Sequence, residues 1–324
     1  MLVLRALNLG DLLVAVPALR ALRRAFSDRR ITLATPASLE PIVARIGAVD
    51  QLLDTPEPGA LTWRGPPPDV VVNLHGAGPR SHRVLDALGA SARIGFRSPD
   101  GGGGWSGPDW SSGDGLHERE RWCFLLRHAG IPADPTDITL PAPPHPARGA
   151  PILVHPGARF GAKRWPADRF AQVAAALERP DHPVLITGST GERPLTAEVA
   201  ARAGLGTERV MAGRTGLGEL ADLTARAALV VSGDTGIAHL ASAFATPSVV
   251  LFGPVGPERW GPPADGPHIA LHHPALCRGH PFADDPDPAL LAIDVGEVLH
   301  AAALAHHRGA RQSASRSGLQ PGSG

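Results

Sequence analysis

The chain lacks the features that mark several large classes of protein. Its 324 residues contain only two cysteines, Cys123 and Cys277, which fit neither a disulfide framework nor a metal quartet. Lysine plus arginine and aspartate plus glutamate number 31 each, so no excess charge attracts nucleic acid. The fifteen histidines include no pair in a metal-binding pattern such as H-E-x-x-H. We therefore expect no metal, no cofactor and no nucleic-acid partner, and an anionic ligand must be recognised by local groups.

The sequence also lacks an apolar run that reaches the roughly 20 residues of a membrane span. Residues 1–26 superficially resemble a signal peptide, but Arg5 and Asp11 interrupt the apolar residues. We interpret this segment as a strand followed by an amphipathic helix, and we expect a cytoplasmic monomer. A cluster of arginines leaves peripheral contact with the inner face of the cell membrane open, although a solvated surface is the simpler interpretation. The cluster is Arg20, Arg23, Arg24, Arg29 and Arg30.

Two common nucleotide-binding motifs are absent as well. No G-x-G-x-x-G follows the first predicted strand, which argues against a dehydrogenase. The segment from Gly157 to Lys163 is one residue short of a Walker A loop, and Arg164 stands where serine or threonine would bind magnesium. A P-loop NTPase is therefore disfavoured.

What the sequence does contain is a repeated alternation of strand-like and helix-like segments. Apolar runs at 2–7, 69–74 and 152–155 predict buried strands, and the spacing of apolar residues in 12–26 and 167–177 predicts amphipathic helices. Strands that alternate with helices predict a mostly parallel sheet covered on both faces. We expect the α/β class, with two Rossmann-like, doubly wound domains facing a central cleft.

A proline-rich stretch separates the two halves, since residues 141–146 hold four prolines. The expected organisation is an N-terminal domain at 1–140, a linker at 141–150, a C-terminal domain at 151–305 and a disordered tail at 306–324. Residues 98–115 are rich in glycine, serine and aspartate and predict a long surface loop, either a disordered insertion or a substrate-facing lid.

The most informative stretch is residues 230–254, which predicts strand, turn, helix, turn and strand. Its helix starts at Asp234, Thr235 and Gly236. Free backbone N–H groups, a hydroxyl and the positive end of the helix dipole can therefore face an anion. Taken alone, the stretch leaves two interpretations equally open: a phosphate or sugar site, and an ordinary helix cap.

Other polar residues also follow predicted strands, at the edge where ligands bind in such folds. Asp11 follows the first strand, and Lys163 and Arg164 come shortly after the strand at 152–155. The remaining candidates at strand ends are His155, Gly157, Gly188 and Ser189 in the second half and Asn73, His75 and Gly76 in the first. A carboxylate in one domain, with cations and helix starts in the other, suits a reaction that deprotonates a nucleophile and releases a diphosphate.

Each candidate also has a purely structural interpretation. Asp11 could cap the first helix, and Lys163 and Arg164 could belong to a solvated face. Trp165 is expected to pack in the core rather than to stack on a base. His239, one turn into an apolar helix, is more often a hydrogen-bonded core residue than a catalyst.

The combination of motifs resembles glycosyltransferase family 9, the heptosyltransferases of lipopolysaccharide core assembly in the cell envelope. The resemblance runs through nearly the whole chain to about residue 305, and it rests on the order and spacing of four segments. These are Gly10-Asp11-Leu12 through Pro17-Ala18-Leu19, His155-Pro156-Gly157, Lys163-Arg164-Trp165-Pro166, and Asp234-Thr235-Gly236 with His239-Leu240-Ala241.

This resemblance implies a GT-B architecture and a metal-independent, inverting transfer from a nucleotide sugar, ADP-heptose in the best-known members. Asp11 matches the proposed general base, and Lys163 matches the lysine that holds the diphosphate. Thr235 and Gly236 match the helix start that donates to phosphate, and Asp234 matches the carboxylate that holds sugar hydroxyls. The motif histidine corresponds to His239, with a structural or ligand-positioning role. His155, Gly157, Gly188 and Ser189 are assigned to the donor side.

The acceptor side is less well defined, and its candidates are Asn73, His75 and Gly76. Asn73 stands where many members carry aspartate, and the cysteine pairs of some members are missing near Cys277. The partners implied are a nucleotide-sugar donor and a glycan or glycolipid acceptor. Two alternatives remain: an epimerase or hydrolase of nucleotide sugars, because GT-B folds also host those, and a non-catalytic protein that binds nucleotide sugars or glycans.

Overall fold

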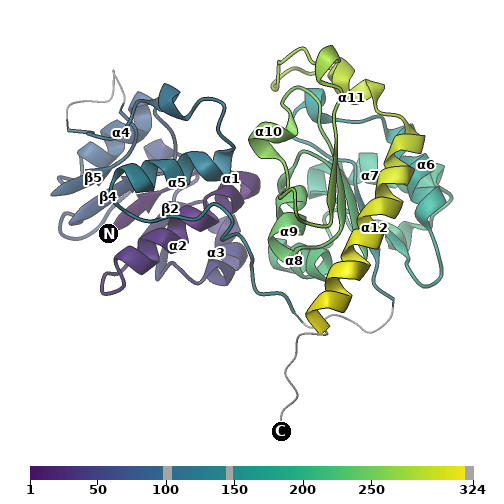
Figure 1. Cartoon of the computed structure of the whole chain (residues 1–324), viewed down its shortest axis with the longest axis horizontal. Coiled ribbons are helices and arrows are strands. Elements are labelled where there is room, and N and C mark those ends of the chain that lie inside the picture. Colours follow the sequence, from purple (N-terminus) through teal and green to yellow (C-terminus); the bar gives the residue numbers. More distant parts are fainter. Residues whose placement is uncertain (98–103, 144–148, 318–324) are drawn as a thin grey trace, which may run out of the picture. The chain divides into compact units, whose positions relative to one another are not determined.

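The structure is a computed structural model that describes residues 1–97, 104–143 and 149–317. The chain divides into two compact units, Met1–Leu140 and Pro141–Gly324. Each unit contains one five-stranded sheet in which every strand pair is parallel, and helices cover the sheet (Figure 1). The α/β fold class predicted from the alternating pattern is therefore confirmed.

The first unit has the strand order β3-β2-β1-β4-β5. Its strands are β1 (Leu2–Leu4), β2 (Thr32–Thr35), β3 (Gln51–Asp54), β4 (Val70–Asn73) and β5 (Ala92–Ile94). Its helices are α1 (Leu9–Val14), α2 (Val16–Ala25), α3 (Glu40–Ile46), α4 (Pro79–Asp86) and α5 (Glu118–His128). The helical segment predicted at 12–26, with an interruption at Pro17, is divided between α1 and α2, because Pro17 has no backbone N–H to donate and occupies the first turn of α2.

The second unit has the strand order β10-β9-β8-β6-β7. Its strands are β6 (Ile152–His155), β7 (Val184–Ile186), β8 (Leu229–Gly233), β9 (Ser248–Leu251) and β10 (His268–Leu271). Its helices are α6 (Ala167–Leu177), α7 (Arg193–Arg202), α8 (Leu217–Arg226), α9 (Gly236–Phe244), α10 (Pro257–Trp260), α11 (Pro288–Ala292) and α12 (Val295–Ser317).

Alternate residues of β6 belong to different parts of the core. Ile152 and Val154 pack with α6, α7 and α12 on one face of the sheet, while Leu153 packs with α8 and α9 on the other. Because both faces are covered, a continuous apolar strand is stable here, as is usual for parallel sheets.

The expected disordered tail differs from the structure, in which α12 continues to Ser317. Tertiary contacts explain why a serine- and arginine-rich segment stays helical. Arg308 donates to the carbonyl of His268 at 3.2 Å, Gln312 donates to the carbonyl of Asp265 at 3.0 Å, and Gly309 packs on Pro247. The last part of the predicted tail, residues 318–324, lies outside the described residues.

The predicted surface loop at 98–115 also differs where the structure describes it. Trp105 is buried and donates its indole N–H to the carboxylate of Asp86 at 3.0 Å. Trp110 packs edge-on against Phe96, with ring centroids 5.1 Å apart. These two aromatic side chains anchor residues 104–115 to the first unit, whereas residues 98–103 lie outside the described residues.

Candidate active site

The candidate residues lie where the order of strands reverses. In the first unit the chain proceeds from β1 through β2 to β3 and then places β4 on the other side of β1. In the second unit it proceeds from β6 to β7 and then places β8 on the other side of β6. Ligands of open parallel sheets bind at the carboxyl ends of strands beside such a reversal. Asp11 and His75 follow β1 and β4, and Lys163 and Asp234 follow β6 and β8.

Lys163 and Asp234 form an ion pair in the second unit. The Nζ atom of Lys163 donates to Oδ2 of Asp234 at 2.5 Å, and the two side chains are 23% and 6% exposed. The backbone N–H of Asp234 donates to the carbonyl of Leu251 at 3.1 Å, which fixes the turn after β8. The other carboxylate oxygen of Asp234 lies 3.9 Å from Nε2 of His239, whose ring is edge-on to Trp260. A cation that follows β6 and a carboxylate that follows the neighbouring strand β8 are thus held together.

The start of α9 is adjacent to this pair. Thr235 is the N-cap residue, and its side chain makes no capping bond to the helix. Asp234 is bonded to Lys163 rather than to the first turn. The ordinary helix-cap interpretation therefore does not describe this turn, and α9 begins two residues after Asp234.

A second group of predicted donor-side residues meets around Glu192, which was not among the predicted site residues. The Glu192 carboxylate accepts hydrogen bonds from the backbone N–H and the hydroxyl of Ser189, both at 2.8 Å. Gly157 and Gly188 face the same side chain, since a Cβ on Gly157 would lie 2.1 Å from Oε1 of Glu192. The spacing Ser-x-x-Glu is a capping-box pattern, and it is the signal by which Glu192 could have been found.

His155 and Glu192 influence each other electrostatically. Burial lowers the pKa of His155, and the Glu192 charge opposes that shift. Burial raises the pKa of Glu192, but the opposing effects, led by the hydrogen bonds from the Ser189 backbone N–H and hydroxyl, leave the net pKa lowered. His155 also contacts the Thr187 hydroxyl through Nδ1 at 3.0 Å. We therefore expect a neutral imidazole beside an ionised carboxylate at neutral pH.

In the first unit, a buried arginine holds the turn that carries Asp11. Arg5 is 1% exposed, and its Nε donates to the backbone carbonyl of Asp11 at 2.9 Å, while Nη2 lies 3.6 Å from the Asp11 carboxylate. Nη1 donates to the carbonyl of Leu74, and the guanidinium lies 4.5 Å from the ring centroid of Trp122. In the sequence, Arg5 is recognisable only as a break in an apolar run.

Asp11 does not cap the first helix, because α1 begins at Leu9 with Asn8 as its N-cap, and Asp11 lies inside the first turn. Its side chain is 26% exposed. The alternative role considered for Asp11, a helix cap, is therefore wrong. A partly exposed carboxylate with a buried cation behind it is the arrangement that the structure presents.

The predicted acceptor-side residues have different environments. Asn73 is fully buried, and its side chain contacts Ser81, His82 and the backbone N–H of His75, so it fixes the end of β4 from inside the unit. His75 is half-buried, and no described residue bonds its Nδ1 atom. Burial and the neighbouring Arg5 lower the pKa of His75 to about 4, although Asp11 opposes the shift. Of these residues, His75 shares the electrostatic environment of Asp11, and Gly76 follows it in the turn after β4.

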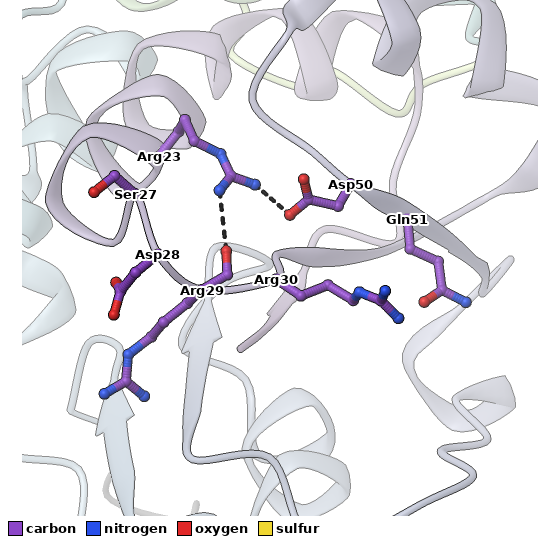
Figure 2. Close-up of a pocket in the computed structure, with 7 residues that line it drawn as sticks. All are labelled: Arg23, Ser27, Asp28, Arg29, Arg30, Asp50 and Gln51. Carbon is purple, nitrogen blue, oxygen red and sulfur yellow. Dashed lines mark hydrogen bonds and ion pairs between the residues drawn. The ribbon is translucent and has the colours of Figure 1, made fainter.

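A hollow of about 560 Å³ lies elsewhere in the first unit (Figure 2). It is lined by Arg23, Ser27, Asp28, Arg29, Arg30, Asp50 and Gln51. These residues precede or begin β2 and β3, so they lie at the amino ends of the strands, opposite the end that carries Asp11. We therefore do not assign the hollow to the active site.

Most arginines of the cluster noted in the sequence form ion pairs in and around this hollow. Arg23 is ion-paired with Asp50, and Arg29 pairs with Asp69 at 3.0 Å. Arg20 and Arg24 share the carboxylate of Asp137, each at 2.7 Å. Four of the five arginines are therefore paired with carboxylates. No helix of the described residues is long and apolar enough to cross a membrane.

No group of three or more histidine, cysteine, aspartate or glutamate side chains within residues 1–97, 104–143 and 149–317 is arranged to hold a metal ion. Cys123 is buried, and burial raises the pKa of its thiol to about 12.

Comparison with known proteins gives one family. Residues 121–276 match the family model described as glycosyltransferase family 9 (heptosyltransferase). No curated protein sequence matches the chain.

Solved structures share the fold across most of the chain. A family 9 glycosyl transferase from Veillonella parvula is 20% identical with a TM-score of 0.75, and 94% of this chain and 96% of that one are covered. ADP-heptose LPS heptosyltransferase II of E. coli is 20% identical with a TM-score of 0.74, covering 95% and 98%. The E. coli heptosyltransferase WaaC, solved with ADP, is 18% identical with a TM-score of 0.65, covering 83% and 92%. The two parallel five-stranded sheets are thus those of the GT-B heptosyltransferase structures, as predicted.

Proposed function

We propose that this chain, which belongs to glycosyltransferase family 9, transfers a heptose or a related sugar from ADP-heptose to a hydroxyl of a cell-envelope glycan or glycolipid. The family and the glycosyltransferase class agree with the resemblance that the sequence motifs carried. The donor is proposed because structures of E. coli WaaC were solved with ADP and with ADP-2-deoxy-2-fluoro heptose. We place the reaction in the cytoplasm, at the inner face of the membrane when the acceptor is a glycolipid.

The observation that carries the donor assignment is the Lys163–Asp234 ion pair beside the start of α9. The diphosphate leaving group gains negative charge as its bond to the anomeric carbon breaks. Lys163 and the backbone N–H groups at Thr235 and Gly236 would stabilise that charge without a metal ion. Asp234, released from Lys163 by the phosphate, would then accept hydrogen bonds from the sugar hydroxyls. His239 would hold the second oxygen of Asp234 in place.

Asp11 is the proposed general base. The acceptor hydroxyl would lose its proton to Asp11 while its oxygen forms the new bond to the anomeric carbon, on the face opposite the leaving diphosphate, so the configuration inverts. Arg5 supports this role by fixing the backbone turn that carries Asp11, since its Nε donates to the Asp11 carbonyl at 2.9 Å. His75, which is neutral at physiological pH, would contact the acceptor beside Asp11.

Replacement of Asp11 tests this assignment. Asp11→Asn keeps the shape of the side chain but cannot take up the proton, so acceptor-dependent release of ADP should fall by about 10²- to 10⁴-fold. Binding of ADP, measured by calorimetry, should stay unchanged. Asp28→Asn is the matched control, since Asp28 is an exposed aspartate at the other end of the sheet. Transfer by Asp11→Asn at the native rate would remove Asp11 from the role.

A further inference from the structure

The turn that carries Lys163 is bound on one side by a segment from the far end of the unit. The backbone N–H of Ala162 donates to the carbonyl of Ala283 at 2.9 Å, and the N–H of Asp287 donates back to the carbonyl of Ala162 at 3.2 Å. Gly161 lies so close to this segment that a Cβ there would stand 1.5 Å from the carbonyl oxygen of Asp284. Residues 283–287 and 161–162 therefore form one backbone-to-backbone contact.

Two glycines at the ends of β8 and β9 also lie close to this turn. A Cβ on Gly233 would lie 3.1 Å from the carbonyl oxygen of Lys163, and one on Gly253 would lie 3.1 Å from that of Ala162. A side chain at either position would crowd the turn by a few tenths of an ångström, so the backbone at Ala162 and Lys163 lies between the strand ends and residues 283–287.

One buried carboxylate holds that segment in shape. Asp287 is 3% exposed, and its Oδ1 atom accepts from the N–H of Ala289 at 2.9 Å, which caps α11. Its Oδ2 atom accepts from the N–H of Arg278 at 3.1 Å. The two bonds join the beginning and the end of the loop 278–289 through a single side chain, and the N–H of the same residue binds Ala162.

We propose that Asp287 is a positioning residue for the donor site, which sets the direction of Lys163 by fixing the backbone turn on which Lys163 stands. A lysine side chain has four rotatable bonds, so the region that its ammonium group can reach is set by the position of the backbone, while Asp234 restrains it within that region. From this backbone position, Nζ of Lys163 reaches Oδ2 of Asp234 at 2.5 Å. The inference rests on the proposed function, because Lys163 has to bind the diphosphate for its direction to matter.

The experiment is a double-mutant cycle that measures the affinity for ADP by calorimetry. Lys163→Ala should weaken binding by about 10- to 100-fold, the value of one hydrogen bond between charged groups. Asp287→Ala should weaken it by about 10-fold in the native background and leave it unchanged in the Lys163→Ala background, because coupled residues are not additive. Asp287→Asn, which keeps the acceptor for Ala289, should restore part of the affinity.

Asp294→Ala is the matched control, because Asp294 is an exposed carboxylate that binds the N–H of Glu297 at the start of the next helix, α12. It removes a comparable cap and should bind ADP as the native protein does. If Asp287→Ala lowers ADP affinity equally in the native and the Lys163→Ala backgrounds, Asp287 does not act through Lys163, and the proposal is overturned. If Asp287→Ala does not fold, the ADP affinity of Asp287→Asn becomes the test. A native ADP affinity in Asp287→Asn would also overturn the proposal. An unchanged affinity in Lys163→Ala would instead contradict the proposed function.

Discussion

Replacement of Arg5 by methionine should destabilise the first unit far more than replacement of an ordinary surface arginine. Arg5 is 1% exposed and donates to the carbonyls of Asp11 and Leu74. The Asp11 carboxylate is 26% exposed, so water screens part of the ion pair. Most of the cost therefore comes from two carbonyls left without a donor, about 1–3 kcal/mol each. With the remaining charge interaction, we expect the free energy of unfolding to fall by about 3–5 kcal/mol.

Urea unfolding followed by tryptophan fluorescence measures this loss. Four of the six tryptophans belong to the first unit, and Trp122 lies directly beside the Arg5 guanidinium. Arg93→Met is the control, because Arg93 pairs with Asp86 at 2.8 Å with both side chains about one quarter exposed. Such a pair contributes about 1 kcal/mol or less. Equal destabilisation by the two variants would refute the view that Arg5 is a buried support for the Asp11 turn.

Three further predictions concern stability. A hydrogen bond from the N–H of Ile31, followed by the Arg23 guanidinium, holds the pKa of Asp50 below its ordinary value of 3.8. Asp50 therefore stabilises the fold above that pH, and the difference in urea midpoint between the native protein and Asp50→Asn should shrink as the pH falls below it. Trp165→Phe removes the N–H that donates to the carbonyl of Ile293 at 3.0 Å, and because Arg169 also donates to that carbonyl at 2.8 Å, the loss in chemical denaturation should be about 1 kcal/mol. ADP affinity should stay unchanged, and weaker ADP binding would mean that the indole contacts the nucleotide. Ala245 has φ of 53°, so Ala245→Gly should raise the free energy of unfolding by about 1 kcal/mol, and a lower melting temperature would contradict this.

The strand ends were the part of the site that local sequence patterns could predict. In parallel sheets the carboxyl ends of strands share one edge, so polar residues just after apolar runs are candidates from their position in the sequence alone. Asp11, Lys163 and Asp234 were selected in this way. Short motifs carry this information because each one lies within a single strand, turn and helix.

The residues that support these side chains could not be found by the same reasoning. Arg5 binds Leu74, which is 69 positions away in the sequence, and a lone arginine in an apolar strand gives no sign of such a partner. The contact between Ala162 and Asp287 spans an even longer separation. Composition was misleading for residues 104–115, where many small polar residues obscured Trp105 and Trp110, the two side chains that anchor the segment. Tertiary contacts determine all three features, and periodicity does not report them.

The most direct test of the proposed transfer is incubation of the purified protein with ADP-heptose, with and without an envelope glycolipid acceptor. ADP release, acceptor mass and the anomeric configuration of the new linkage would be measured together. We predict that ADP appears only when the acceptor is present, in equal amount to the glycosylated product, and that the linkage has the opposite configuration to the donor. Release of ADP and free sugar without an acceptor would contradict the proposed transfer and identify a hydrolase.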